Sequence, residues 1–155
     1  MKQGQIGDCW LIGALSVLAV RDELLRGGTK KIEKQGEEIG PELANSFYKG
    51  VYPPIFHMYR KKNLYVLRFY KNFKWRYVII DDRLPVFRGN CSPVFGRCSS
   101  LHELWVPLIE KAYAKLHGCY ETLISGFLDD GLTDLTGLVS TKMKLHDNNG
   151  NFPDK

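Results

Sequence analysis

An apolar stretch near the amino terminus constrains the fold of this chain more than any other feature. Residues 10–20 read WLIGALSVLAV and carry no charge, with Asp8 before them and Arg21-Asp22-Glu23 after them. The run is too short to cross a bilayer, which needs about 20 apolar residues. It is apolar nearly all round, which is typical of a helix buried on most sides. The stretch therefore predicts a core helix from residue 9 to about residue 25.

The same stretch resembles the apolar region of a secretion signal, because Lys2 precedes it. Asp8 at the edge of the run and the absence of an A-x-A cleavage site before Arg21 disfavour that interpretation. The chain has four cysteines in 155 residues, without a C-x-x-C pair or a zinc-type Cys/His spacing. This sparse pattern fits reduced thiols better than a disulfide framework. We therefore expect a cytoplasmic protein without a membrane span.

The middle and the end of the chain predict a small sheet and a second helix. Residues 64–70 and 75–80, LYVLRFY and WRYVII, are rich in aromatic and β-branched residues and read as a hairpin. Residues 102–118 carry an apolar stripe at Leu104, Leu108, Ala112 and Leu116, and Pro107 places the start of regular helix close to itself. Ser100 and Glu103 have the spacing of a capping box.

These elements are segregated along the chain rather than alternating, so the predicted fold class is α+β. A chain of 155 residues suits one domain. We expect that domain to span residues 1–140, because residues 141–155 are polar, lose periodicity and predict a flexible tail.

A basic and aromatic segment raises the possibility of nucleic-acid binding. Residues 59–77, YRKKNLYVLRFYKNFKWRY, interleave aromatic and basic side chains, a combination that can stack bases and hold phosphates. A net charge of +5 is only moderate for such a function. An amphipathic sheet with a solvated basic face explains the same pattern, and we favour that explanation.

Cys9 stands at the head of the predicted core helix. A helix N-terminus carries partial positive charge and favours the nucleophilic thiolate. Gln3 precedes Cys9 across a loop that contains Gly4 and Gly7, so its amide could donate to the negative oxygen of a tetrahedral intermediate. A buried cysteine that acts only as a small apolar side chain is the alternative.

Four segments, in order, resemble the calpain family of papain-like cysteine proteases. They are residues 3–11, QGQIGDCWL; residues 75–86, WRYVIIDDRLPV; residues 102–123, HELWVPLIEKAYAKLHGCYETL; and residues 129–138, DDGLTDLTGL. The resemblance implies a papain-like core subdomain in which the nucleophile helix packs with further helices and a small antiparallel sheet. It also implies limited cleavage of protein substrates inside the cell.

The resemblance assigns roles to three residues. It implies that Cys9 is the nucleophile, that Gln3 is the oxyanion-hole donor and that the backbone of Gly126 contacts substrate. In the family a histidine and an asparagine come from a second subdomain, which we do not find in this chain. His146 is followed by asparagines, but LHDNNGN offers neither a strand nor apolar neighbours to hold a catalytic pair.

The resemblance also implies calcium dependence, yet we cannot assemble the ligands. A calcium ion needs several oxygen ligands. The family position ahead of the second helix corresponds to Ser100, and Asp81 and Asp82 close the predicted hairpin. We therefore expect an endopeptidase fragment whose second subdomain, or a partner chain, supplies the base. An inactive half-protease that binds partners is the alternative.

Overall fold

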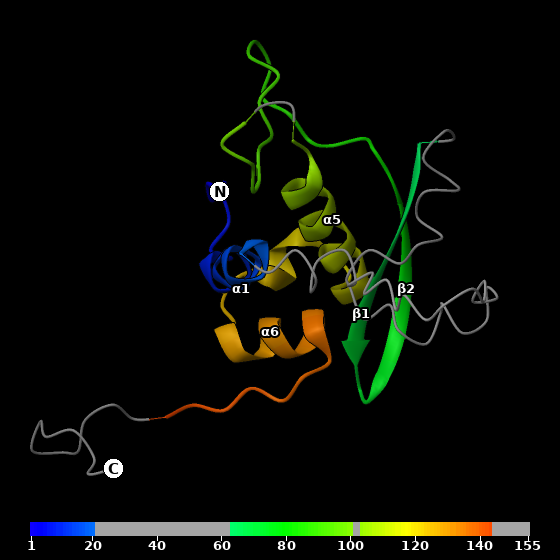
Figure 1. Cartoon of the computed structure of the whole chain (residues 1–155). Coiled ribbons are helices and arrows are strands. Elements are labelled where there is room, and N and C mark those ends of the chain that lie inside the picture. The colour runs from blue at the N-terminus through cyan, green and yellow to red at the C-terminus, as the bar shows by residue number, and fades with distance from the viewer. Residues whose placement is uncertain (21–62, 101–102, 144–155) are drawn as a thin grey trace, which may run out of the picture.

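The computed structural model describes residues 1–20, 63–100 and 103–143. Its elements are helix α1 (Cys9–Ala19), strands β1 (Leu64–Lys71) and β2 (Lys74–Asp81), helix α5 (Trp105–His117), a 3-10 helix η2 (Tyr120–Leu123) and helix α6 (Leu128–Thr136). The helices lie together on one side of a two-stranded antiparallel sheet (Figure 1). The predicted α+β class is confirmed.

The hairpin forms as the sequence predicts. Leu64 pairs with Asp81 at the open end, and Lys71 pairs with Lys74 at the closed end. The two turn residues, Asn72 and Phe73, have φ angles of 54° and 61°. A two-residue turn with positive φ at both positions matches the right-handed twist of the strands. The turn therefore fixes the register that brings alternate residues of β2 to the core.

Helix α1 is only partly enclosed by the described residues. Leu11, Ala14, Leu15 and Leu18 are buried on one face. The opposite face is open, since Val17 is 51% exposed. The expectation of burial on most sides is therefore wrong for this face, and residues 21–25 of the expected helix lie outside the described residues. No helix among residues 1–20, 63–100 and 103–143 is long and apolar enough to cross a membrane.

Helix α5 begins two residues before Pro107, where a proline is tolerated in the first turn. The predicted capping box is wrong, because Leu104 is the N-cap residue and provides no side-chain hydrogen bond. Glu103 instead donates its backbone N–H to the carbonyl of Ser100 at 3.3 Å. Of the predicted stripe, Leu108 and Ala112 are buried, whereas Leu104 is exposed ahead of the helix.

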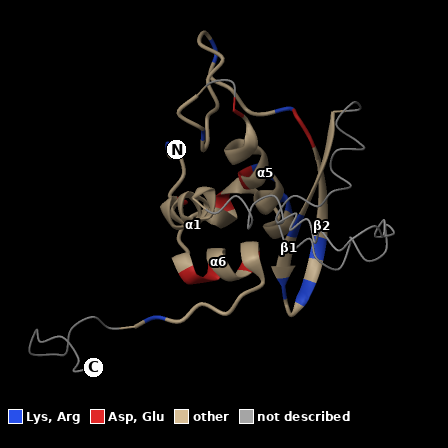
Figure 2. Cartoon of the chain, in the orientation of Figure 1, with Lys and Arg blue, Asp and Glu red and all other residues tan. Residues whose placement is uncertain are grey.

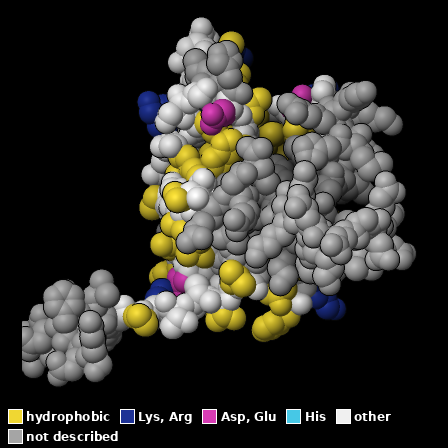
Figure 3. All heavy atoms as spheres, in the orientation of Figure 1, with side chains coloured by type: hydrophobic (Ala, Val, Ile, Leu, Met, Phe, Trp, Pro, Cys, Tyr) yellow, Lys and Arg dark blue, Asp and Glu magenta, His cyan; other side chains and the backbone are white. Residues whose placement is uncertain are grey.

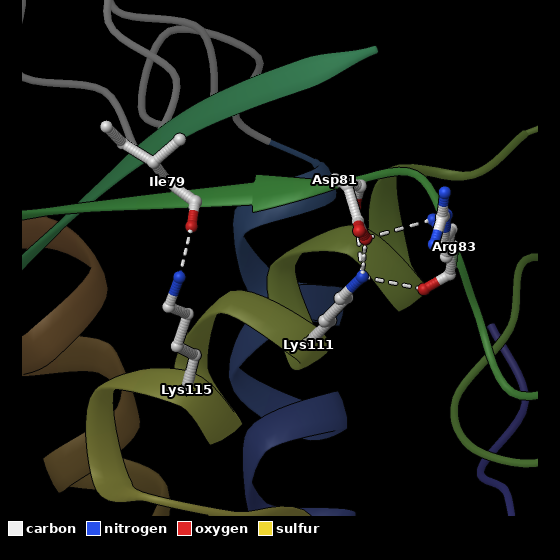
Figure 4. A network of polar contacts seen from close by, with 5 residues as sticks. All are labelled: Ile79, Asp81, Arg83, Lys111 and Lys115. Carbon is white, nitrogen blue, oxygen red and sulfur yellow. Dashed lines mark hydrogen bonds and ion pairs between the residues drawn. The ribbon is translucent and has the colours of Figure 1, made fainter.

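Two lysines of α5 attach the helix to the end of β2 (Figure 4). Lys111 donates to the carboxylate of Asp81 and, at 2.6 Å, to the carbonyl of Arg83. Lys115 donates to the carbonyl of Ile79 at 2.8 Å. The hydrogen bond from Lys111 lowers the pKa of Asp81. The side chain of Asp81 thus has a structural partner at this hairpin end.

Helix α6 is an element that the sequence analysis did not foresee. It ends at Gly137, whose φ of 70° suits a residue without a side chain. Asp134 on this helix is buried and accepts hydrogen bonds from Lys71 Nζ at 2.6 Å and from the Tyr113 hydroxyl at 2.5 Å. This carboxylate joins α6 to β1 and α5. Residues 141–143 have no regular structure, and the rest of the predicted tail lies outside the described residues.

Tyr113→Phe tests the tie at Asp134. The change removes one donor from a buried carboxylate, and hydrogen bonds to charged groups contribute about 1.5–3 kcal/mol. We expect a loss of that size in the free energy of unfolding, measured with urea. Tyr77→Phe is the matched control, because Tyr77 is 61% exposed on β2. Equal effects of the two changes would contradict a special role for the Asp134 network.

Candidate active site

Cys9 is the first residue of α1, and its side chain is exposed. The backbone carbonyl of Asp8 accepts the N–H groups of Leu11 at 2.9 Å and Ile12 at 3.1 Å, which closes the first turn. The thiol therefore stands at the positive end of a helix whose inner face is anchored in the core. An exposed thiol contradicts the alternative in which Cys9 is a buried apolar side chain.

The four cysteines are all free, as expected for reduced thiols. Cys9, Cys91 and Cys119 are exposed and Cys98 is buried. Burial raises the pKa of the Cys98 thiol, so this cysteine is a suitable unreactive reference.

Gln3 lies on the loop that leads to Cys9, with its side chain exposed. Its Nε2 donates to the carbonyl of Ile6 at 2.6 Å. A side-chain amide carries two N–H groups. The bond to Ile6 therefore orients the amide and leaves its other N–H outside that bond.

The segment around Gln3 is fastened to residues 94–97 on both sides. Lys2 and Arg97 exchange backbone hydrogen bonds at 2.8 and 2.9 Å, and Gln5 N–H donates to the carbonyl of Val94 at 3.1 Å. Gly4 lies against the backbone of Phe95, where an added Cβ would come within 2.2 Å of a carbonyl carbon. Only glycine permits this close approach.

Gly126 lies beside the same loop. The backbone N–H of Ser125 donates to the carbonyl of Gly7 at 3.3 Å. A Cβ added at Gly126 would come within 2.4 Å of the Trp10 ring, whose Nε1 donates to the carbonyl of Leu123 at 2.9 Å. The residue after Cys9 thus packs directly on Gly126. The structure brings all three predicted site residues to the surroundings of one loop.

A cavity of about 300 Å³ lies next to Trp10 and Gly126. It is lined by Trp10, Lys71, Tyr113, His117, Thr122, Leu123, Ser125, Gly126 and Asp130. The ring of His117 is tilted against that of Tyr113, with 4.5 Å between the ring centroids, and burial together with Lys71 lowers the pKa of His117. Cys9 is not among the residues that line this cavity.

The sequence analysis missed a buried pair of carboxyl groups, Asp8 and Glu110. Both residues are fully buried. Glu110 Oε2 accepts the N–H of Gly96 at 2.7 Å, and the carboxyl group of Asp8 is near enough to raise the pKa of Glu110. Burial and the neighbouring Asp8 raise the pKa of Glu110 to about 9. A charged residue inside the otherwise apolar VPLIE segment was the available signal.

The described residues do not gather a side-chain metal site. Within residues 1–20, 63–100 and 103–143, no three His, Cys, Asp or Glu side chains lie close enough to hold one ion. These side chains do not fit a calcium ion on their own.

An exposed cysteine that heads a core helix, reached through a glycine-containing loop with an oriented glutamine amide, is the arrangement of a papain-like cysteine protease. The comparisons with known proteins agree. The sequence model of the calpain family cysteine proteases matches residues 1–153. The chain belongs to the calpain family of cysteine proteases, and the predicted resemblance is confirmed.

The curated relatives are much longer than this chain. It is 37% identical to Calpain-5 of Mus musculus over 145 residues. This matched region is 94% of the chain and 20% of the relative. It is 39% identical over 146 residues to Calpain-13 of Rattus norvegicus and 34% identical over 150 residues to Calpain-9 of Homo sapiens, each covered to 18% of its length. The chain therefore spans about a fifth of the length of these relatives.

Gly126→Ala tests the contact between Gly126 and Trp10. The added methyl group has to displace the indole ring, and overpacking of this kind costs about 1–3 kcal/mol. We expect that loss in urea unfolding, together with a shifted indole N–H resonance of Trp10. Gly7→Ala is the control, because its Cβ would meet Ile124 only at 3.8 Å. A neutral Gly126→Ala variant would contradict the close packing.

Glu110 predicts an unusual dependence of stability on pH. Its pKa is raised from 4.5 to about 9, so between these values the folded protein holds a proton that the unfolded chain releases. Its stabilising contribution is complete below pH 4.5 and is lost as pH rises to about 9, with a slope of up to about 1.4 kcal/mol per pH unit. We expect urea unfolding between pH 7 and 8.5 to show this fall.

Glu110→Gln should remove that slope, because glutamine has no proton to lose. Glu103→Gln, at an exposed glutamate just before α5, is the control and should leave the slope unchanged. A slope that persists in Glu110→Gln would assign the pH dependence to another group.

Proposed function

We propose that this chain supplies the nucleophile and the oxyanion donor of a calpain-type cysteine endopeptidase. The observation that carries the proposal is the exposed thiol of Cys9 at the N-terminus of α1, with the amide of Gln3 oriented on the preceding loop. Family membership makes protein substrates the matching substrate class. The activity of the longer relatives extends to this chain only as part of this proposal.

The proposed reaction is acyl transfer. The Cys9 thiolate attacks the scissile carbonyl carbon, and the C=O electron pair moves to the oxygen. The N–H of Gln3 that is not bonded to Ile6 donates to this oxyanion. The oxyanion then collapses to a thioester as the amine takes a proton from the general acid and leaves. Water hydrolyses the thioester and restores the thiol.

Gly126 is proposed to pair with the backbone of the substrate. It is exposed and has no side chain to obstruct an extended peptide. Its neighbour Ser125 donates its backbone N–H to the carbonyl of Gly7. Trp10 beneath it supplies a rigid support. The role rests on the family resemblance and on this position.

The general base is proposed to come from outside the described residues. His117 is the histidine within the described residues, and it lines a cavity that Cys9 does not line. His57, His102 and His146 lie outside the described residues. As the resemblance implies, a second subdomain or a partner chain would provide the histidine and the asparagine. Calcium dependence and a cytoplasmic location are proposed on the same ground.

A binding role without catalysis is the second candidate, and exposed apolar side chains favour it. Figure 3 shows hydrophobic side chains on the face over α1 and α6. Exposed apolar residues on or beside these helices are Val17, Phe127, Leu128 and Leu138. Such a surface is typical of a docking interface. Absence of activity after a second subdomain is supplied would favour this candidate.

Several side chains of the basic and aromatic segment are used inside the fold rather than on a free surface. Basic residues do occur along β1 and β2 (Figure 2). However, Phe69 is buried in the core, Arg68 lies 4.5 Å over the ring of Trp75, and Lys71 is bonded to Asp134. These side chains already have partners within the fold. We therefore do not propose nucleic-acid binding.

Thiol labelling tests the nucleophile. A negative charge at a helix N-terminus is stabilised by about 0.3–1 kcal/mol, which corresponds to a twofold to fivefold factor. We expect iodoacetamide at pH 7 to modify Cys9 faster than the exposed Cys91 and Cys119 by at least that factor, with buried Cys98 slowest. Mass spectrometry of the tryptic peptides gives the four rates. Labelling of Cys9 no faster than Cys91 would count against an activated thiol.

A peptidase assay tests the placement of the base. We expect the 155-residue chain alone to cleave casein at a negligible rate, with calcium or with EDTA, and Cys9→Ser to set the background. Addition of a calpain second subdomain should give cleavage that depends on Cys9. Robust cleavage by the chain alone, abolished by Cys9→Ser, would show that one of its own histidines serves as base.

A further inference from the structure

Asp8 occupies the N-cap position of α1 but does not use its side chain as a cap. An aspartate there normally accepts backbone N–H groups of the first turn, and that bond stabilises the helix by about 1 kcal/mol. Here the side chain makes no cap hydrogen bond, and it is fully buried. The carboxyl group instead lies near Glu110 on α5, whose pKa it raises. The N-cap hydrogen bond of Asp8 is therefore absent, and its carboxyl group lies near that of Glu110 instead.

Two adjacent buried carboxyl groups cannot both be charged at low cost, because their repulsion and desolvation add. Glu110 Oε2 already accepts the Gly96 N–H. No N–H or O–H of the described residues donates to Asp8 Oδ1, Asp8 Oδ2 or Glu110 Oε1. A single proton between the two groups supplies the missing donor, since a protonated carboxyl group donates as well as accepts.

The pair is connected to both candidate site residues. Asp8 precedes Cys9 directly in the chain. Glu110 accepts the N–H of Gly96, and residues 94–97 are hydrogen-bonded to Lys2 and Gln5, which lie on either side of Gln3. Space is also restricted there, because a Cβ on Gly96 would come within 2.9 Å of Glu110 Oε2.

We propose that Asp8 and Glu110 share one proton and act as a positioning pair, which fixes the loop of Gln3 relative to Cys9. The proposal rests on the proposed function, in which these two residues act on one carbonyl group. When the shared proton is lost, repulsion separates the carboxyl groups and the bond to Gly96 loosens. The pairing of residues 2–5 with residues 94–97 then weakens.

The groups that face Glu110 support a single shared proton. Asp8 approaches it from the start of α1, and Tyr120 approaches it from η2. Burial and Glu110 raise the pKa of Tyr120, so its ring stays neutral. The lysines of α5 are directed to β2 instead, with Lys111 on Asp81 and Lys115 on the carbonyl of Ile79. No described cation therefore lies on the pair to neutralise a second charge.

Hydrogen–deuterium exchange of the 155-residue chain tests the pair. The chain is labelled at about pH 7 and about pH 10, with labelling times scaled to the intrinsic exchange rate. In the unmodified chain, we expect the protection of the amides of Lys2, Gln5 and Arg97 to be about tenfold or more lower at pH 10 than at pH 7. In Glu110→Gln the amide donates to Asp8 and its oxygen accepts from Gly96. Protection there should change less than about twofold over the same range.

Two controls make the result specific. Glu103→Gln changes an exposed glutamate in the same way and should keep the pH-dependent loss. The amides of the β1–β2 hairpin report global opening and should change little in any variant. Glu110→Leu removes both bonds and should lose protection of residues 2–5 already at pH 7. Where that variant does not fold, the comparison with Glu110→Gln still decides.

The outcomes separate this proposal from the proposed function. Protection that is independent of pH in the unmodified chain, or a loss that persists in Glu110→Gln, would overturn the positioning pair whatever the reactivity of Cys9. Slow labelling of Cys9 with the expected exchange profile would instead reject the nucleophile and leave the pair standing.

Discussion

Burial of one face of α1 is the constraint on which the rest of the structure depends. Leu11, Leu15 and Leu18 anchor the helix in a core shared with α5 and the sheet, and each buried side chain of this kind contributes about 1.5–3 kcal/mol. Because the helix cannot rotate without exposing these side chains, its first residue is held in place. Cys9 is exposed for the same reason that Leu11 is buried. The exposed position of Cys9 is thus set by the packing of the helix behind it.

Polar contacts then fix the elements around this core. Asp134 joins α6 to β1 and α5, and Lys111 joins α5 to the end of β2. The Asp8–Glu110 contact joins α5 to the loop before α1. Each of these contacts links segments that are distant in the sequence. Together they hold the surroundings of Gln3, Cys9 and Gly126 without placing any of them in the core.

Local patterns predicted the elements that local physics controls. Alternation and β-branched residues gave the hairpin, and Asn72 gave its turn, because both depend on neighbours along the chain. The capping box at Ser100 was wrong because a four-residue pattern does not reveal where the helix starts. Helix α6 was missed because its segment is short and contains Gly131, although Leu128, Leu132 and Leu135 have helical spacing; it packs against α1 and β1. Glu110 was read only as part of an amphipathic helix.

By itself the sequence determined the family, the α+β class and the candidate residues Gln3, Cys9 and Gly126. Motifs of this kind are local, and residue type and spacing carry them. Only the tertiary structure decided that Gly126 packs on Trp10 and that Asp8 turns inward to Glu110. Those facts depend on which faces of separate elements meet. A sequence states that a carboxyl group exists, whereas its burial beside a second one, and hence its proton, is a property of the packed fold.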